Sequence, residues 1–138
     1  MTTENSCPIA ACASFLGDKW NLLILRELFK NNHRFEDFRK NLSIAPTILT
    51  KRLQQLCEQN IISKRRYSEH PPRDEYYLTP IGESLLPIIL MMRKWGHEHL
   101  DVPYPSQVKN RLTDKEVDPV LIDKNNEKVI ALEDLYVE

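Results

Sequence analysis

Polar side chains recur along one side of a predicted helix that begins at Pro46, a residue suited to a first helical turn, and ends near residue 59. At 100° per residue, Leu53 and Leu56 lie within about 40° of Leu49 and form an apolar stripe. The opposite side carries hydroxyl, amine and amide groups, which come from Thr47, Thr50, Lys51 and Gln54. Groups of these types can bond base edges or phosphates in the major groove of double-stranded DNA. The spacing therefore predicts a helix that is anchored by leucines and presents a surface able to bind DNA.

Positive charge, which DNA binding requires, is concentrated in the same part of the chain. Residues 34–73 hold nine Lys and Arg against four Asp and Glu, a balance of +5 within a protein whose formal net charge is −1. A basic window of this kind can be the electrostatic footprint of a nucleic-acid site. An ordinary solvated surface can have the same composition, so charge alone does not decide between the two interpretations.

The neighbouring segments predict the elements that would position this helix. A short helix over residues 36–42 precedes it, and the two form a helix-turn-helix candidate. Two runs that favour β-structure follow, at residues 61–67 and 75–79. Residues 68–74 are predicted to project as a loop, because Pro71 and Pro72 cannot donate to a strand ladder. Arg65 lies in the first run and Arg73 at the tip, from which an arginine can reach an adjacent minor groove.

Helices are also predicted on both sides of this motif. Pro8 makes Cys7 the cap of a short helix, which Gly17 would close in a left-handed conformation. Asp18 would cap the next helix. After the hairpin, one long helix is expected from Pro80 to Leu100, kinked or locally irregular at a proline in its interior. Its wide apolar face comprises Leu85, Ile88, Ile89, Met92 and Trp95.

These elements predict a mainly α fold with a small β-hairpin, an α+β winged helix-turn-helix. Residues 7–100 would form the DNA-binding and dimerisation domain. Residues 101–138 would form a C-terminal extension, a linker followed by a hairpin with strands at 117–122 and 128–132. The two parts differ in charge, at +3 for residues 1–100 and −4 for residues 101–138.

Several classes of protein are not expected from this composition. The N-terminus lacks the basic and apolar stretches of a signal peptide, and the longest apolar run falls far short of the about 20 residues that span a membrane. The chain has only three cysteines, a small and odd number that does not fit a disulfide scaffold. We therefore expect a cytoplasmic protein with no membrane partner.

Catalysis, cofactors and metal binding are not expected either. No phosphate-binding loop, nucleophile arrangement or paired-carboxylate motif can be read from the spacing. His97 and His99 lie two positions apart on a predicted helix, where side chains point away from each other. Residues 113–138 contain no cysteine, which leaves no thiolate for a metal site in the extension.

Short motifs follow one another along residues 7–100 in an order typical of one known family. They are Cys7-Pro8, Gly17-Asp18-Lys19-Trp20, Arg34-Phe35, Leu49-Thr50-Lys51-Arg52-Leu53, Pro71-Pro72-Arg73, Glu75-Tyr76 and Trp95-Gly96. This part of the chain resembles the HxlR-type family of MarR-like winged helix-turn-helix transcription regulators. The resemblance implies a homodimer that binds an operator and represses, or occasionally activates, nearby genes.

The resemblance also implies roles for individual residues. Those that would face the major groove are Pro46, Thr47, Thr50 and Lys51. Arg34 and Arg52 would hold phosphates. His70 to Arg73 would form the tip of the wing, the hairpin that follows the recognition helix. The first helix and the apolar face of the long helix would make the dimer. Two positions depart from the family pattern, since Ala45 replaces a Ser-like helix cap and Asn60 replaces a glycine.

Cys7 is a candidate thiol sensor. At the cap of a helix its sulfur would lie near free amide groups and the positive end of the helix dipole, which favours the thiolate form. Some members of the resembled family sense oxidants or electrophiles through a cysteine at this place. The alternative is an inert thiol at a dimer interface.

The sequence thus predicts a homodimeric regulator of transcription that reads an inverted-repeat operator in double-stranded DNA. An oxidant acting on Cys7, or a small-molecule effector, would change the spacing of the two DNA-reading helices. Two alternatives remain open at this point. One is a winged helix used for protein–protein contact, because a fold does not fix a function. The other is a thiol redox enzyme using Cys7, although no Cys-x-x-Cys spacing is present.

Overall fold

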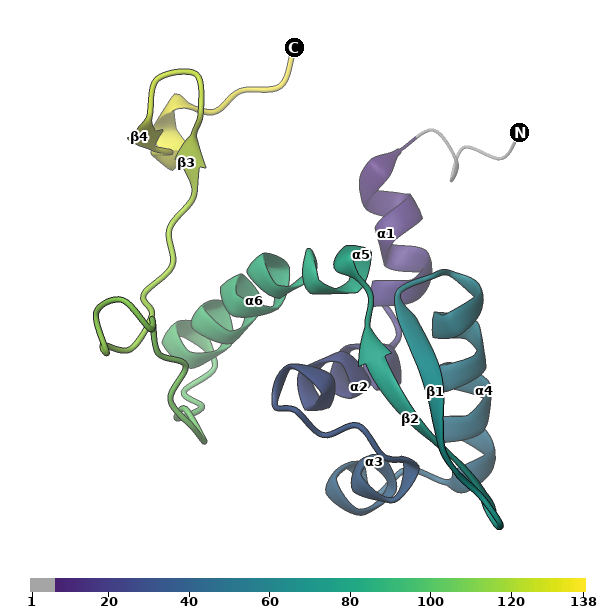
Figure 1. Cartoon of the computed structure of the whole chain (residues 1–138). Helices are drawn as coiled ribbons and strands as arrows, with labels where there is room; N and C mark the ends of the chain where they lie inside the picture. Colours follow the sequence, from purple (N-terminus) through teal and green to yellow (C-terminus); the bar gives the residue numbers. More distant parts are fainter. Residues whose placement is uncertain (1–6) are drawn as a thin grey trace. The chain divides into compact units, whose positions relative to one another are not determined.

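The computed structural model describes residues 7–138, which form two compact units with the boundary in the chain between Leu86 and Pro87 (Figure 1). The first unit holds the predicted helix-turn-helix, and the second holds the extension. Among the residues described, no helix is both long and apolar enough to cross a membrane.

The first unit contains the helix-turn-helix and the hairpin. Its elements in chain order are α1 (Pro8–Leu16), α2 (Lys19–Phe29), α3 (Phe35–Leu42), α4 (Pro46–Glu58), β1 (Ile62–Glu69), β2 (Pro72–Leu78) and the one-turn helix α5 (Pro80–Glu83). Helices α2, α3 and α4 pack on one another and on one side of the antiparallel β1–β2 hairpin. The predicted fold class, a mainly helical winged helix-turn-helix with a small sheet, is confirmed.

The core of this unit is built from the stripes that helical spacing predicted. Leu49 and Leu56 of α4 are fully buried and Leu53 is 2% exposed; Ile24 and Leu25 of α2, the helix packed on α4, are also fully buried. Burial of one such side chain contributes about 1.5–3 kcal/mol relative to its exposure to water. The apolar stripe of α4 therefore fixes which of its sides can face outward.

A buried carboxylate that local spacing did not indicate ties α2 to α3. Glu27 is 1% exposed, and its Oε2 atom accepts hydrogen bonds from Asn32 at 2.7 Å and from Asn41 at 3.0 Å. Arg26 donates to its Oε1 atom at 3.1 Å. Burial acts to raise the pKa of Glu27, but the hydrogen bonds from Asn41, Asn32 and Arg26, together with the charge of Lys30, outweigh it and lower the pKa. The group is therefore held as a carboxylate.

Two local expectations are wrong. Gly17 is right-handed, with φ −70° and ψ −13°, because Asp18 directly takes the extended cap conformation that turns the chain into α2. The loop expected over 68–74 is reduced to a tight turn, since Ser68 pairs with Arg73 and Glu69 with Pro72. A bulge between Arg66 and Ser68 shifts the register and allows the ladder to continue to the tip.

The long helix expected from Pro80 to Leu100 is instead two helices. Helix α5 ends at Glu83, and α6 runs over Leu86–His99. A proline ring clashes with the carbonyl group four residues before it, and Pro87 stands four residues after Glu83. Gly82 in α5 lies against the residue just before β1, where an added Cβ atom would come 2.2 Å from the Ile61 carbonyl oxygen.

The second unit consists of α6 and the extension that follows it. Its other elements are short: β3 (Ile122–Asp123) pairs with β4 (Lys128–Val129), and a 3₁₀ turn spans Leu132–Asp134. The predicted tail hairpin is therefore present but shorter than expected. Residues 102–119 contact the charged side of α6. Arg93 donates to the Ser106 carbonyl, and its Nη2 atom lies 3.2 Å from Oε1 of Glu116. The Nζ atom of Lys94 lies 2.8 Å from Oδ1 of Asp118.

Candidate nucleic-acid interface

The polar side of α4 faces solvent. Thr47, Thr50, Lys51 and Gln54 are exposed, whereas the three leucines of the same helix are buried. Thr50 donates its hydroxyl hydrogen to the Pro46 carbonyl at 2.9 Å, and Gln54 donates to Glu58 at 3.3 Å. Lys51 forms no salt bridge with any residue from 7 to 138. The helix thus offers hydroxyl, amine and amide groups that the rest of the unit leaves uncovered.

The start of α4 is also exposed. Ala45 is the N-cap residue and provides no side-chain hydrogen bond to the first turn, as its departure from the family pattern predicted. The turn before it is short, and Ser43 closes α3 in a left-handed conformation with φ 50°. Backbone N–H groups of an uncapped first turn are unsatisfied donors at the positive end of the helix dipole. They favour an anionic partner at this place.

The hairpin tip lies at the same end of the unit as the first turn of α4, at the lower right of Figure 1. Arg73 and His70 at this tip are exposed, and Arg73 forms no salt bridge within the described chain. Arg65 is exposed and lies over the ring of Tyr77, 4.9 Å from its centroid. The tip therefore presents the cationic Arg73 at the end of the unit where α4 begins, and Arg65 adds a second cation farther along β1.

The structure separates the nine basic residues of the 34–73 window into two groups. Four are matched by carboxylates of the same chain: Arg34 by Glu75, Arg39 by Glu36, Arg52 by Asp18, and Arg66 by Asp74 and Glu69. The other five are exposed and form no salt bridge within residues 7–138; they are Lys40, Lys51, Lys64, Arg65 and Arg73. Lys40 and Lys64 were not assigned individual roles from the sequence, although the charge window contains both.

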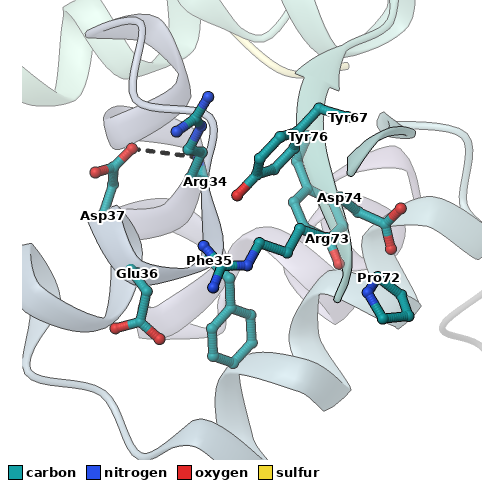
Figure 2. Close-up of a pocket in the computed structure, with 9 residues that line it drawn as sticks. All are labelled: Arg34, Phe35, Glu36, Asp37, Tyr67, Pro72, Arg73, Asp74 and Tyr76. Atoms are coloured by element: carbon teal, nitrogen blue, oxygen red, sulfur yellow. Dashed lines mark hydrogen bonds between the residues drawn. The ribbon is translucent and has the colours of Figure 1, made fainter. Parts of the chain in front are cut away.

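Arg34 lies in a hollow of about 670 Å³ between the start of α3 and the hairpin (Figure 2). Its guanidinium is 3.2 Å from Glu75 and 4.3 Å from the ring centroid of Tyr67. The hydrogen bond from the Tyr77 hydroxyl lowers the pKa of Glu75; burial opposes this effect and Arg34 adds to it. Arg73 reaches across the hollow toward α3 in Figure 2. The half-exposed Arg34 is thus held in place by contacts within the chain.

Arg52 was predicted, with Arg34, to hold phosphates. It points instead toward the α1–α2 corner, the turn at Gly17 and Asp18 that joins these two helices. Its Nη2 atom lies 2.9 Å from Oδ2 of Asp18, and its side chain is 22% exposed. Burial acts to raise the pKa of Asp18, but the hydrogen bonds from Arg52 and from the backbone of Asn21 and Trp20 outweigh it and lower the pKa. Asp18 caps α2, as the sequence predicted, and is ionised when it meets Arg52.

The residues expected at a dimer interface fall into two groups. Leu85 is buried within its own unit and Ile89 is half-buried. Ile88, Met92 and Trp95 are 42%, 51% and 57% exposed and lie on one side of α6, since they are spaced by four and three residues. No residue of α1 is buried, and Ile9 is exposed.

Cys7 caps α1 with an extended backbone and is an exposed, free thiol. Its carbonyl oxygen accepts the Ala11 N–H at 2.9 Å, and its side chain makes no cap hydrogen bond. Within residues 7–138, no group of three or more His, Cys, Asp or Glu side chains is placed to hold a metal ion.

A helix-turn-helix followed by a basic hairpin, with a solvated polar side on the second helix, defines a winged helix-turn-helix protein. The model of the HxlR-like helix-turn-helix family matches residues 15–104, which is more than half of the chain. The chain belongs to this family, as the motif resemblance predicted, and is a helix-turn-helix transcriptional regulator.

Named relatives and solved structures agree with this assignment. The HTH-type transcriptional regulator sll1512 of Synechocystis sp. is 40% identical over 100 residues, 72% of this chain and 74% of that protein. The HTH-type transcriptional regulator Rv3095 of Mycobacterium tuberculosis is 34% identical over 116 residues, 83% of this chain and 73% of that protein. The crystal structure of PA1607, described as a transcription factor, has a TM-score of 0.81 at 32% identity over 96% of this chain and 94% of that one. The oxidised redox regulator HypR has a TM-score of 0.62 at 34% identity, covering 70% of this chain and all of the other.

Proposed function

We propose that the protein is a homodimeric, sequence-specific repressor that places α4 of each protomer, its recognition helix, in a major groove of double-stranded operator DNA. The observation that carries this proposal is the uncovered polar side of α4. Thr47, Thr50 and Lys51 would contact base edges or phosphates, with Pro46 at the entry of the helix. Base contacts select the sequence, and lysines and arginines supply salt-dependent affinity.

The wing would hold the DNA beside the recognition helix. Arg73 and Arg65 carry charges that no carboxylate of the described chain neutralises, so they can pair with phosphates without first breaking a salt bridge. His70 at the tip would lie close to the same backbone. Arg34 would contribute its exposed side, although its charge is shared with Glu75.

A second copy of the chain would cover the apolar side of α6 and the exposed surface of α1. Ile88, Met92 and Trp95 form an apolar stripe of a kind that marks protein–protein contacts. A two-fold dimer would read an inverted repeat whose half-sites are about 34–36 Å apart. A ligand or thiol chemistry that moves the dimer helices would change this spacing, and the exposed Cys7 at the start of α1 is the candidate thiol. The relative described as a redox regulator supports this type of control. Such a regulator would work in the cytoplasm.

Titration of a labelled duplex from upstream of its own gene tests the proposal. We expect fluorescence anisotropy to report binding that survives competition by random DNA. Lys51→Ala should weaken operator binding by about 1–3 kcal/mol if Lys51 reads a base, and a similar loss on random DNA would assign it to a phosphate. Lys124→Ala, an exposed lysine in the β3–β4 turn, is the control for loss of one positive charge. A folded protein that binds no fragment would contradict the proposal and favour a protein–protein module.

A further inference from the structure

One ion pair joins the recognition helix to the α1–α2 corner. The Nη2 atom of Arg52 lies 2.9 Å from Oδ2 of Asp18, and the two side chains are 22% and 28% exposed. The Nε atom of Arg52 is buried and has no hydrogen-bond partner among the described residues. Arg52 follows Lys51 directly in the chain, yet its charged group is turned toward its own protein.

Asp18 also caps the start of α2 at this corner. Its Oδ1 atom accepts the backbone N–H groups of Trp20 at 2.8 Å and Asn21 at 3.2 Å, while its other oxygen meets Arg52. The buried Asn21 donates its side-chain amide to the Phe15 carbonyl at 3.0 Å, in the last turn of α1. Polar contacts therefore run without interruption from α1 through Asn21 and Asp18 to Arg52 on α4, all within one compact unit.

These contacts reach the surface that would face DNA. Arg52 lines a hollow of about 320 Å³ together with Thr47 and Lys51, with Trp20 of α2 beside them. An arginine in this place has two possible uses. It can be turned outward to a phosphate, or it can hold the helix on which the neighbouring groove-facing residues stand.

We propose that Arg52 is a positioning residue for DNA recognition, and that its pair with Asp18 fixes the orientation of α4 relative to the α1–α2 corner. The inference rests on the proposed function, because it concerns how the groove-facing residues are held. Through this pair the recognition helix and α1, one of the proposed dimer helices, keep a fixed relation. A phosphate would have to compete with Asp18 for the guanidinium, so the five unmatched cations are better placed than Arg52 to bind phosphates.

Two substitutions in the full-length protein distinguish an Arg52 that positions α4 from an Arg52 that binds a phosphate. Asp18→Asn removes the charge that Arg52 meets but keeps the cap of α2, since asparagine is as good an N-cap residue as aspartate. Arg52→Gln removes the other partner. Each should lower operator affinity about 3- to 30-fold, the range typical of residues that act without touching the ligand. The double variant should be no weaker than the weaker single variant, because both changes break the same ion pair.

The salt dependence of binding gives the decisive readout. We expect the slope of log K against log salt to equal the wild-type slope in all three variants, because the protein still neutralises the same number of phosphates. Arg111→Gln, an exposed arginine of the extension that forms no salt bridge within residues 7–138, is the matched control and should change neither affinity nor slope. Circular dichroism and size-exclusion chromatography check that each variant is folded and has the wild-type oligomeric state.

Three results would overturn the inference. If Arg52 holds a phosphate, Arg52→Gln reduces the slope by about 0.9 for each phosphate that the protein no longer neutralises, and Asp18→Asn leaves affinity unchanged or raises it by freeing the guanidinium. If the pair only stabilises the fold, the variants melt at lower temperature but bind with wild-type affinity when fully folded. If the affinity changes in the double variant add, the two residues act separately. A wild-type protein that binds no operator would overturn the proposed function as well, whereas each of the three results leaves it standing.

Discussion

Helices α4 and α6 are similar in length, with 13 and 14 residues, and both are amphipathic, but they expose opposite sides. Helix α4 buries its leucines and leaves its hydroxyl and amine groups in solvent. Helix α6 has no buried residue; it uses Arg93 and Lys94 to hold the extension and leaves Met92 and Trp95 more than half exposed. An uncovered polar side suits a hydrated polyanion, and an uncovered apolar stripe suits another protein surface. The comparison thus supports the proposal that α4 binds DNA and that a second copy of the chain covers α6.

Truncation of one apolar residue on each helix tests this difference most strongly. Leu53→Ala leaves a cavity in the core of the first unit and should lower the free energy of unfolding by about 2–5 kcal/mol. Met92→Ala removes a side chain that is 51% exposed and should cost far less at a protein concentration where the dimer is dissociated. Urea unfolding of the two variants under that condition makes the comparison. Equal losses of stability would mean that the α6 stripe is covered within its own chain.

Trp95→Ala should act on association rather than folding. Buried aromatic residues are frequent hot spots of protein interfaces, so we expect the dimer to weaken by about 2 kcal/mol, close to 30-fold in its dissociation constant. Sedimentation equilibrium measures this change. His99→Ala, at the end of the same helix, where the ring lies 5.0 Å from Trp95, shows how much of the effect comes from the pair. An unchanged dimer in Trp95→Ala would remove α6 from the interface.

A substitution of Glu27 tests the buried carboxylate that joins α2 to α3. Glu27→Gln keeps the shape but loses the charge that its donors surround, and should cost about 1–3 kcal/mol at neutral pH. Because the folded pKa lies below the ordinary value of 4.5, this contribution is present above about pH 4.5 and is lost as pH falls through the folded pKa. The difference between wild type and variant in urea unfolding should therefore shrink at acid pH. A difference that grows on acidification would contradict the assigned direction.

The smallest expected effect is a change in the salt dependence of DNA binding, which should differ between matched and unmatched cations of the wing. Arg73→Ala should reduce the slope of log K against log salt by about 0.9 for each phosphate contact, hence by about 1.8 in a dimer, and leave the dimer intact. Arg66→Ala removes an arginine already matched by Asp74 at 3.2 Å and should change the slope less. Operator titrations between low and moderate salt measure both slopes. Dissociation of Arg73→Ala into monomers would contradict the wing assignment.

Periodicity was sufficient to predict much of the fold. The leucine stripe of α4 and the cap at Asp18 follow from residue type and local spacing. Two of the errors arose at prolines. Pro87 was placed inside a helix, but its clash with the preceding turn ends α5 at Glu83. The prolines at the hairpin tip indicated a loop, although a bulge lets the ladder continue beside them.

The interface was predictable as a set of residues but not as a set of contacts. The exposed polar side of α4 could be read from the sequence, because it is the complement of the leucine stripe. The pairing of Arg52 with Asp18 could not, since the two residues lie 34 positions apart and nothing local indicates that they meet. The same holds for Arg34 and Glu75, and for the buried Glu27. Sequence gives the number of cations in the window, and tertiary contacts decide which of them remain available to phosphates.

Guanine methylation interference on the bound operator tests most directly whether the exposed side of α4 enters a major groove. Methylation at N7 blocks the major-groove edge of guanine. We therefore expect binding to be prevented by methylation of guanines in two patches about one helical turn apart, roughly 34–36 Å. In Lys51→Ala, interference should weaken at the positions that Lys51 contacts and persist elsewhere. Tight operator binding that no major-groove methylation affects would contradict the placement of α4 in the groove.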